Sequence, residues 1–222
     1  MKNDNSVKHS KILLVEGKDE KNLCECALDI LKIADVQIID CEGGSNIAKR
    51  LLLLSKDENF SLVTNVVIVC DAEKNILSRI HSLQSALASA GLPNIRSDTL
   101  ASESFNPKVS AWISPDCQSN GMLEDLFIKT LESTELMKLT KAFVDSLRCL
   151  PKDISPGAPT FPTNIPKAIA HACLTATDPL VKGIGLAVKR GFWDLNHAAM
   201  DQFRSFLLTS FADATPSNVA TT

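Results

Sequence analysis

The sequence of 222 residues contains no tyrosine and few other aromatic residues, with two tryptophans and nine phenylalanines. Proteins that bind single strands by stacking present several aromatic rings to the bases, and this chain has little material for such a platform. Basic residues are not in excess either, since 23 lysines and arginines stand against 26 aspartates and glutamates. No run of five basic residues occurs. A role in nucleic-acid binding therefore cannot rest on bulk charge and needs a defined site.

Long apolar segments are also missing. The longest apolar run, around residues 66–70, falls far short of the ~20 residues that a membrane-spanning helix needs. Residues 1–10 are polar and contain no apolar signal segment. We therefore expect a cytoplasmic protein with no membrane partner. The seven cysteines form no CxxC pair, which favours reduced thiols over a zinc site or disulfides.

Three common catalytic motifs are absent. The sequence has no GxxxxGK[ST] loop, so it carries no P-loop nucleotide site of its own. Its four histidines show no metal-binding spacing, and no GxSxG turn marks a serine hydrolase. Any chemistry must therefore come from other residues.

Hydrophobic patterning in the first half predicts alternating strands and helices. Residues 11–15, 36–39 and 63–70 are short apolar runs, and the last of them suits a central parallel strand covered on both faces. A segment with helical character follows each run. The order βαβαβα with short connections predicts an α/β fold with right-handed crossovers and a mostly parallel central sheet between helical layers.

The second half is expected to be mainly helical. A fourth strand is predicted at 109–114, and five prolines between residues 151 and 166 predict a loop. We expect an α/β domain over residues 1–132 and a helical C-terminal extension over 133–222 that packs on it and ends in a frayed tail from 213. Helices are predicted at 121–131, 134–150, 167–176 and 198–211.

Acidic residues follow two of the predicted strands where these strands end. Glu16 comes directly after the first strand, and Asp71 ends the central one. Ligands of parallel sheets bind outside the carboxyl ends of the strands, so both carboxylates are expected at one edge. Glu20 lies four residues after Glu16. Glu73 lies two residues after Asp71, and in extended geometry that spacing points both side chains the same way.

These acids have a structural explanation as well as a functional one. The helix dipole alone favours acids in a first turn, and this explains Glu20 or Glu73 taken singly. Two strand ends that present acids side by side are different, because close carboxylates raise each other's pKa and reduce stability unless a cation offsets the repulsion. Grouped carboxylate oxygens are what Mg²⁺ or Mn²⁺ requires. The sequence therefore favours a divalent-metal site.

The same segments resemble the TOPRIM family. Residues 13–20 (LLVEGKDE) are similar to its first motif, a strand followed by Glu-Gly and a further acid. Residues 66–73 (VVIVCDAE) are similar to its second motif, with glutamate in place of the more usual final aspartate. Residues 41–47 (CEGGSNI) resemble the Gly-Gly turn of nucleases of the OLD (overcoming lysogenization defect) class. Residues 111–126 and 166–195 resemble a smaller group of uncharacterised prokaryotic TOPRIM-like proteins.

The resemblance implies a TOPRIM-like, Rossmannoid three-layer α/β/α fold and metal-dependent phosphoryl transfer on DNA or RNA. Glu16 would then act as general acid/base or as a metal ligand. Asp71 and Glu73 would hold one Mg²⁺ or Mn²⁺, and Glu20 and Glu124 would help to bind a second. Glu124 is equally explained as a first-turn acid of its helix. TOPRIM modules are often joined to an ATPase or helicase, which makes such a protein a candidate partner.

Two lysines and one glycine turn are further candidates. Lys18, in the first motif, and Lys167, at the start of a helix, could contact a scissile phosphate, although a lone lysine is more often a solvated surface charge. Gly43, Gly44 and Ser45 could present backbone N–H groups to the phosphate of a bound cofactor. A plain turn, with Ser45 capping the next helix, explains these three residues about as well.

Functions of three classes therefore remain open. The first is a Mg²⁺-dependent nuclease or related phosphotransfer protein of TOPRIM type. The second is a non-catalytic TOPRIM-fold module that binds a metal, a nucleotide or a protein partner, which the balanced charge favours mildly. The third and weakest is a phosphohydrolase of small molecules.

Overall fold

A computed structural model describes residues 6–103, 106–149 and 162–212. Within these residues, four strands form one fully parallel sheet in the order β2-β1-β3-β4. The strands are β1 (Lys11–Val15), β2 (Val36–Asp40), β3 (Asn65–Asp71) and β4 (Lys108–Ser114). The α/β fold that the sequence predicts, with helices around a parallel sheet, is confirmed.

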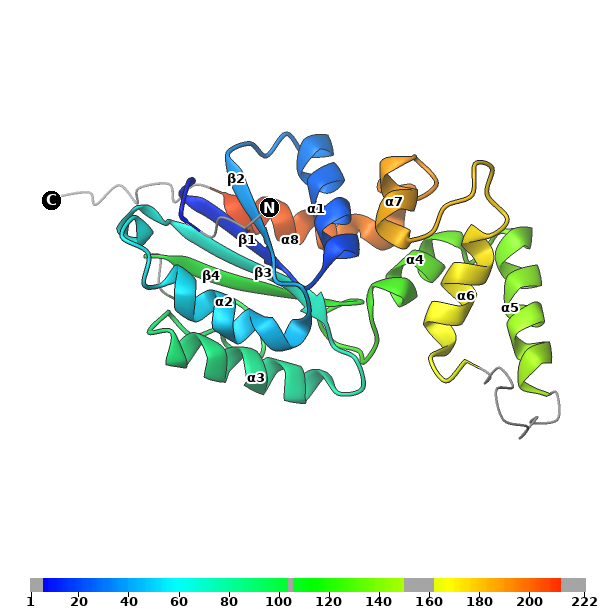
Figure 1. Ribbon diagram of the computed structural model, residues 1–222, viewed down its shortest axis with the longest axis horizontal. Helices are drawn as coiled ribbons and strands as arrows, with labels where there is room; N and C mark the ends of the chain where they lie inside the picture. Colours follow the sequence, from blue (N-terminus) through cyan, green and yellow to red (C-terminus); the bar gives the residue numbers. More distant parts are fainter. Residues whose placement is uncertain (1–5, 104–105, 150–161, 213–222) are drawn as a thin grey trace, which may run out of the picture.

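Helices cover both faces of this sheet (Figure 1). Successive strand residues point to opposite faces, so Ile12 and Leu14 enter the core under α2 (Ile47–Leu54) and α3 (Ile76–Ser89). Leu13 and Val15 enter the other core, which also contains residues of α1 (Lys18–Ile30) and α8 (Asp201–Phe211). Burial on both faces explains why the strands are continuous apolar runs.

A helical extension lies beyond one end of the sheet (Figure 1). The chain then returns, and Phe203 of α8 packs edge-on against Trp112 of β4 with ring centroids 5.2 Å apart. The sequence did not predict α7, which has only six residues. The extension consists of α4 (Leu123–Leu131), α5 (Glu135–Arg148), α6 (Ile165–Leu174) and α7 (Ile184–Lys189).

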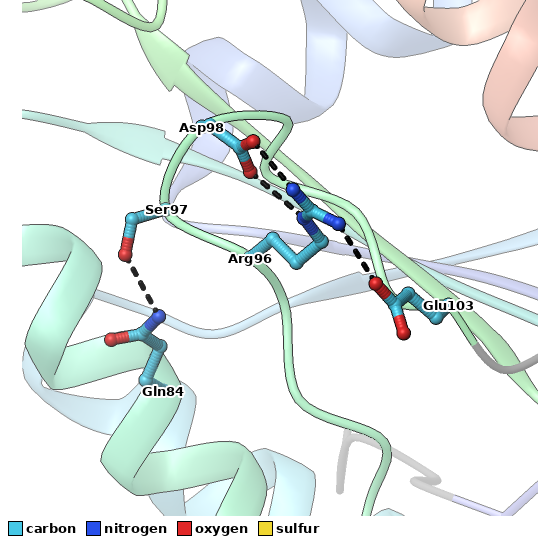
Figure 2. A network of polar contacts seen from close by, with 5 residues as sticks. All are labelled: Gln84, Arg96, Ser97, Asp98 and Glu103. Atoms are coloured by element: carbon cyan, nitrogen blue, oxygen red, sulfur yellow. Dashed lines mark hydrogen bonds and ion pairs between the residues drawn. The ribbon is translucent and has the colours of Figure 1, made fainter.

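The chain covers part of the exposed edge of β4 with its own loop. The N–H of Ala111 donates to the carbonyl of Leu100 at 2.8 Å. Figure 2 shows that Arg96 holds this loop through ion pairs with Asp98 and Glu103, at 2.7 and 2.8 Å. These pairs are solvent-exposed and add little stability, but the loop pairs with backbone groups that an open edge would present to other chains.

Some local predictions were wrong or lie outside the described residues. Ser45 does not cap a helix: it is exposed within the 3₁₀ turn η1 (Gly44–Asn46), and α2 begins after it. Residues 151–161 of the proline-rich segment and the tail from 213 are outside the described residues. The division of the chain at residue 132 stays a prediction. All seven cysteines are free, and no helix among the described residues is long and apolar enough to cross a membrane.

Candidate active site

A cleft of about 430 Å³ lies at the carboxyl ends of β1 and β3. This is the edge at which parallel sheets bind ligands. Its walls come from the β1–α1 turn, the end of β3, the first turn of α4, and the segments that begin α6 and α7. The charged side chains that line it are Glu16, Asp19, Glu20, Asp71, Glu73, Glu124, Lys18, Lys167 and Lys182.

The two strand ends bring Glu16 and Asp71 together, because β1 and β3 are neighbours. Oε2 of Glu16 accepts the backbone N–H of Asp71 at 3.2 Å. Oδ1 of Asp71 accepts the N–H of Leu123 at 2.9 Å, which attaches the first turn of α4 to the sheet. Each of these two carboxylates therefore has one oxygen fixed by a backbone donor.

Arg79 of α3 joins the same two strand ends, and it is not among the residues predicted from the sequence. Its Nε donates to the backbone carbonyl of Asp71 at 2.7 Å, and its Nη2 lies 3.5 Å from Oε2 of Glu16. Both side chains of this ion pair are largely buried. A signal was present, because Arg79 lies in the helix that directly follows the second acidic motif.

Glu20 combines the structural role with a place in the cleft. It lies in the first turn of α1, and its Oε2 accepts the N–H of Gly17 at 3.0 Å, which caps the helix. Glu20 is nevertheless buried, and so is Asp71: each residue is 7% exposed. The capping contact engages one oxygen of the Glu20 carboxylate.

Burial and mutual repulsion shift the protonation of these acids. Burial, followed by the charges of Glu20, Glu16 and Glu124, raises the pKa of Asp71 to about 8. Burial, together with the charges of Glu16 and Asp19, raises the pKa of Glu20 to about 7. A cation in the cleft would favour the charged forms and displace the protons.

The two adjacent acids in the first turn of α4 have different roles. Oδ2 of Asp125 accepts the N–H of Met122 at 2.9 Å, so Asp125 is the capping acid of this helix. Glu124 is buried and lines the cleft. Burial raises its pKa, while the positive charge of Lys167 acts in the opposite direction. The first-turn explanation therefore fits Asp125 better than Glu124.

Glu73 lies at the cleft but not in the geometry that the sequence predicts. The strand ends at Asp71, and Glu73 adopts a left-handed conformation with φ of 56°. It pairs through its backbone with Gly121, donating its N–H at 2.7 Å and accepting at 2.9 Å. The expected extended path from Asp71 to Glu73 is therefore wrong, and the Glu73 side chain is exposed.

Three exposed lysines come to the cleft from separate parts of the chain. Lys18 is the first residue of α1, Lys167 lies in the first turn of α6, and Lys182 precedes α7. Lys18 and Lys182 form no ion pair with any of the residues that the structure describes. Sequence reasoning selected Lys18 and Lys167 but had no signal for Lys182.

The glycine turn supports the acids more directly than it could support a phosphate. The N–H of Gly43 donates to the carbonyl of Glu16 at 2.7 Å and is thus used within the protein. A Cβ on Gly44 would lie 2.9 Å from the Glu16 carboxylate and 3.0 Å from Nη1 of Arg79. Glycine at this position leaves room for the ion pair. Ser45 is not among the residues that line the cleft.

The donor set fits a hard divalent cation held by few protein ligands. Within the described residues, no three aspartate, glutamate, histidine or cysteine side chains are grouped so that they could hold a metal ion by themselves. Mg²⁺ is usually bound by one or two carboxylates, and waters and substrate phosphates complete its octahedron. The carboxylates of Glu16 and Asp71 fit that arrangement.

The sequence has no match among curated proteins. Two solved structures are similar to it, both at 15% identity. The C-terminal region of the Burkholderia pseudomallei OLD protein gives a TM-score of 0.49, with 93% of this chain and 100% of that chain covered. The C-terminal region of the Xanthomonas campestris pv. campestris OLD protein gives 0.38, with 91% and 86% covered. The family model described as "Protein of unknown function (DUF3226)" matches residues 10–212, and the chain therefore belongs to this family.

Proposed function

We propose that the acidic cleft binds Mg²⁺ or Mn²⁺ and that the chain is a metal-dependent nuclease, or a related phosphotransfer protein of TOPRIM type, acting on DNA or RNA. One observation carries this proposal: a single cleft combines buried carboxylates with exposed lysines. Carboxylates attract a divalent cation, and lysines attract a phosphate. Metal-dependent cleavage of phosphodiesters can use both.

The residues that line the cleft, together with Arg79 beside it, have three roles. Glu16 and Asp71 would hold the first ion, with Glu20 and Glu124 available to a second. When bound, such an ion supplies Lewis-acid stabilisation and lowers the pKa of a coordinated water. Arg79 keeps the two strand ends in register through its contacts with Glu16 and the Asp71 carbonyl. Lys18 and Lys167 orient the phosphate.

A different observation favours the non-catalytic alternative. Six carboxylates and three lysines line the cleft, so in the absence of bound cations its charge opposes the approach of a nucleic-acid strand. A module of that kind could hold a nucleotide, or a partner such as an ATPase or helicase, without cleaving a strand.

Cleavage assays separate the two functions. Purified protein is incubated with supercoiled DNA, single-stranded DNA and RNA, with Mg²⁺ or Mn²⁺ and with EDTA. We expect metal-dependent cleavage that falls on the order of 100-fold in Asp71→Asn. Asp116→Asn is the matched control, because Asp116 lies outside the cleft. Equal cleavage by Asp71→Asn would remove the site from consideration. Metal binding without cleavage of any strand would favour the binding module, and a phosphomonoester screen tests the third class.

A further inference from the structure

The segment between α6 and α7 brings Lys182 to the cleft. Its side chain is exposed and lines the same cavity as Lys167 and Glu124. Although six carboxylates line this cavity, Lys182 forms no ion pair within the described part of the chain. A lysine that forms no direct ion pair with the protein is available to an anion from solution.

Close packing of α7 on α1 sets the position of Lys182. The N–H of Gly185 donates to Oδ1 of Asp19 at 2.9 Å. A Cβ on Gly185 would lie 2.7 Å from Cα of Asp19 and 2.8 Å from Cβ of Asn22, so a larger residue would force the helices apart. Asp19 lies in the first turn of α1, the turn that also supplies acids to the cleft. The backbone that carries Lys182 is therefore held close to those acids.

The charge of the cleft makes each lysine important. Six carboxylates against three lysines leave an excess of three negative charges when all are ionised. One divalent cation would leave an excess of one, which still opposes the approach of a phosphate. Lys18 comes from the α/β part, whereas Lys167 and Lys182 come from the extension.

We propose that Lys182 binds a phosphate of the substrate strand, and that the helical extension thereby completes the substrate site. This inference rests on the proposed function and deepens it, since it assigns strand binding to a residue outside the acidic motifs. Lys182 touches the strand and leaves the metal to the carboxylates. Its contribution is electrostatic and depends on salt.

The test measures binding of a labelled single-stranded oligothymidylate by fluorescence anisotropy, with Ca²⁺ as a non-cleaving substitute for Mg²⁺, over a series of salt concentrations. Each phosphate contact to a single strand contributes about 0.7 to the slope of log K against log salt. Lys182→Gln should therefore make this negative slope shallower by about 0.7 and weaken binding about five-fold at about 0.1 M salt. Lys182→Arg should restore both. A purely structural role would not change the slope.

Lys189→Gln is the matched control. Lys189 ends α7, the helix that Lys182 precedes, but it pairs with Glu25 at 2.6 Å and does not line the cleft. Equal affinity and slope in Lys182→Gln and Lys189→Gln would overturn this inference and leave the proposed function standing. A wild-type protein that does not bind the oligothymidylate would also overturn this inference, whereas the proposed function stands or falls by the cleavage assays on DNA and RNA. Gly185→Ala keeps every charge. A shallower salt slope with unchanged circular dichroism would support the role of α7 packing, whereas binding equal to that of the wild type would refute it.

Discussion

Replacing Asp71 with asparagine should stabilise the metal-free protein while removing its affinity for metal. In the folded chain, burial and then the charges of Glu20, Glu16 and Glu124 raise the pKa of Asp71 to about 8. Asparagine has nearly the same shape, and its side-chain oxygen can still accept the N–H that Asp71 accepts from Leu123. It carries no charge that must be buried.

The sign of the effect follows from proton linkage. The pKa of Asp71 in the folded chain lies above the ordinary value of 3.8. At a pH between the two pKa values, the folded chain binds a proton that the unfolded chain has lost, so stability falls as pH rises. At about 1.4 kcal/mol per pKa unit, the loss in free energy of unfolding is about 4 kcal/mol at pH 7, about 0.6 kcal/mol at pH 4 and close to zero below about pH 3. The Asp71→Asn variant lacks this loss.

Urea unfolding in EDTA, at several pH values between about 4 and 8, measures the difference between variant and wild type. We expect the advantage of Asp71→Asn to grow with pH. Asp116→Asn is the control, for which we expect a stability change of the opposite sign. Burial raises the pKa of Asp116, but hydrogen bonds from Ser119 and Lys129 outweigh burial and lower the pKa. This variant should therefore lose stability. An Asp71→Asn gain that is constant with pH, or a loss, would refute the buried-charge explanation.

Three further outcomes are expected. Mg²⁺ or Mn²⁺ at about 100 times its Kd should stabilise the wild type by about 2.7 kcal/mol, measured by thermal unfolding, and an equal effect on Asp71→Asn would place the metal elsewhere. Metal binding at pH 7 should release protons, because the pKa values of Asp71 and Glu20 are about 8 and 7. Calorimetry in buffers of different ionisation enthalpy detects this release, and a binding enthalpy that is the same in every buffer would contradict it. Arg79→Met should destabilise the metal-free protein by about 3 kcal/mol, since it leaves Glu16 largely buried without its cation. In a double-mutant cycle, adding Glu16→Gln should recover much of that loss, and strictly additive losses would show that the pair is not coupled.

The sheet and the position of its acids could be predicted because local sequence determines both. An apolar run without polar breaks is the signature of a strand buried on two faces, and β3 is buried along its whole length. Its direction then fixes Asp71 at the edge where ligands bind. Glu16 follows by the same reasoning from β1, and the neighbouring places of the two strands bring the carboxylates together.

Other parts of the site depend on contacts between distant segments. Lys182 reaches the cleft through α7, whose six residues are too few to show a helical period. Its packing depends on Gly185 and Asp19, which are 166 residues apart. The left-handed backbone of Glu73 is set by its pairing with Gly121, a partner that strand periodicity cannot identify.

The different roles of the two acids in the first turn of α4 were likewise not predictable. Glu124 and Asp125 are adjacent acids in the first turn, and the helix dipole favours both of them. Tertiary structure separates them: Asp125 caps the helix, while Glu124 is buried in the cleft.

The most direct test of a divalent-metal site in this cleft is anomalous diffraction from a crystal soaked in Mn²⁺. The expected result is a strong anomalous peak in the cleft, within bonding distance of carboxylate oxygens of Glu16 and Asp71. A soak at saturating Mn²⁺ that gives no peak there, or gives peaks only at other surfaces of the protein, would contradict the proposed site.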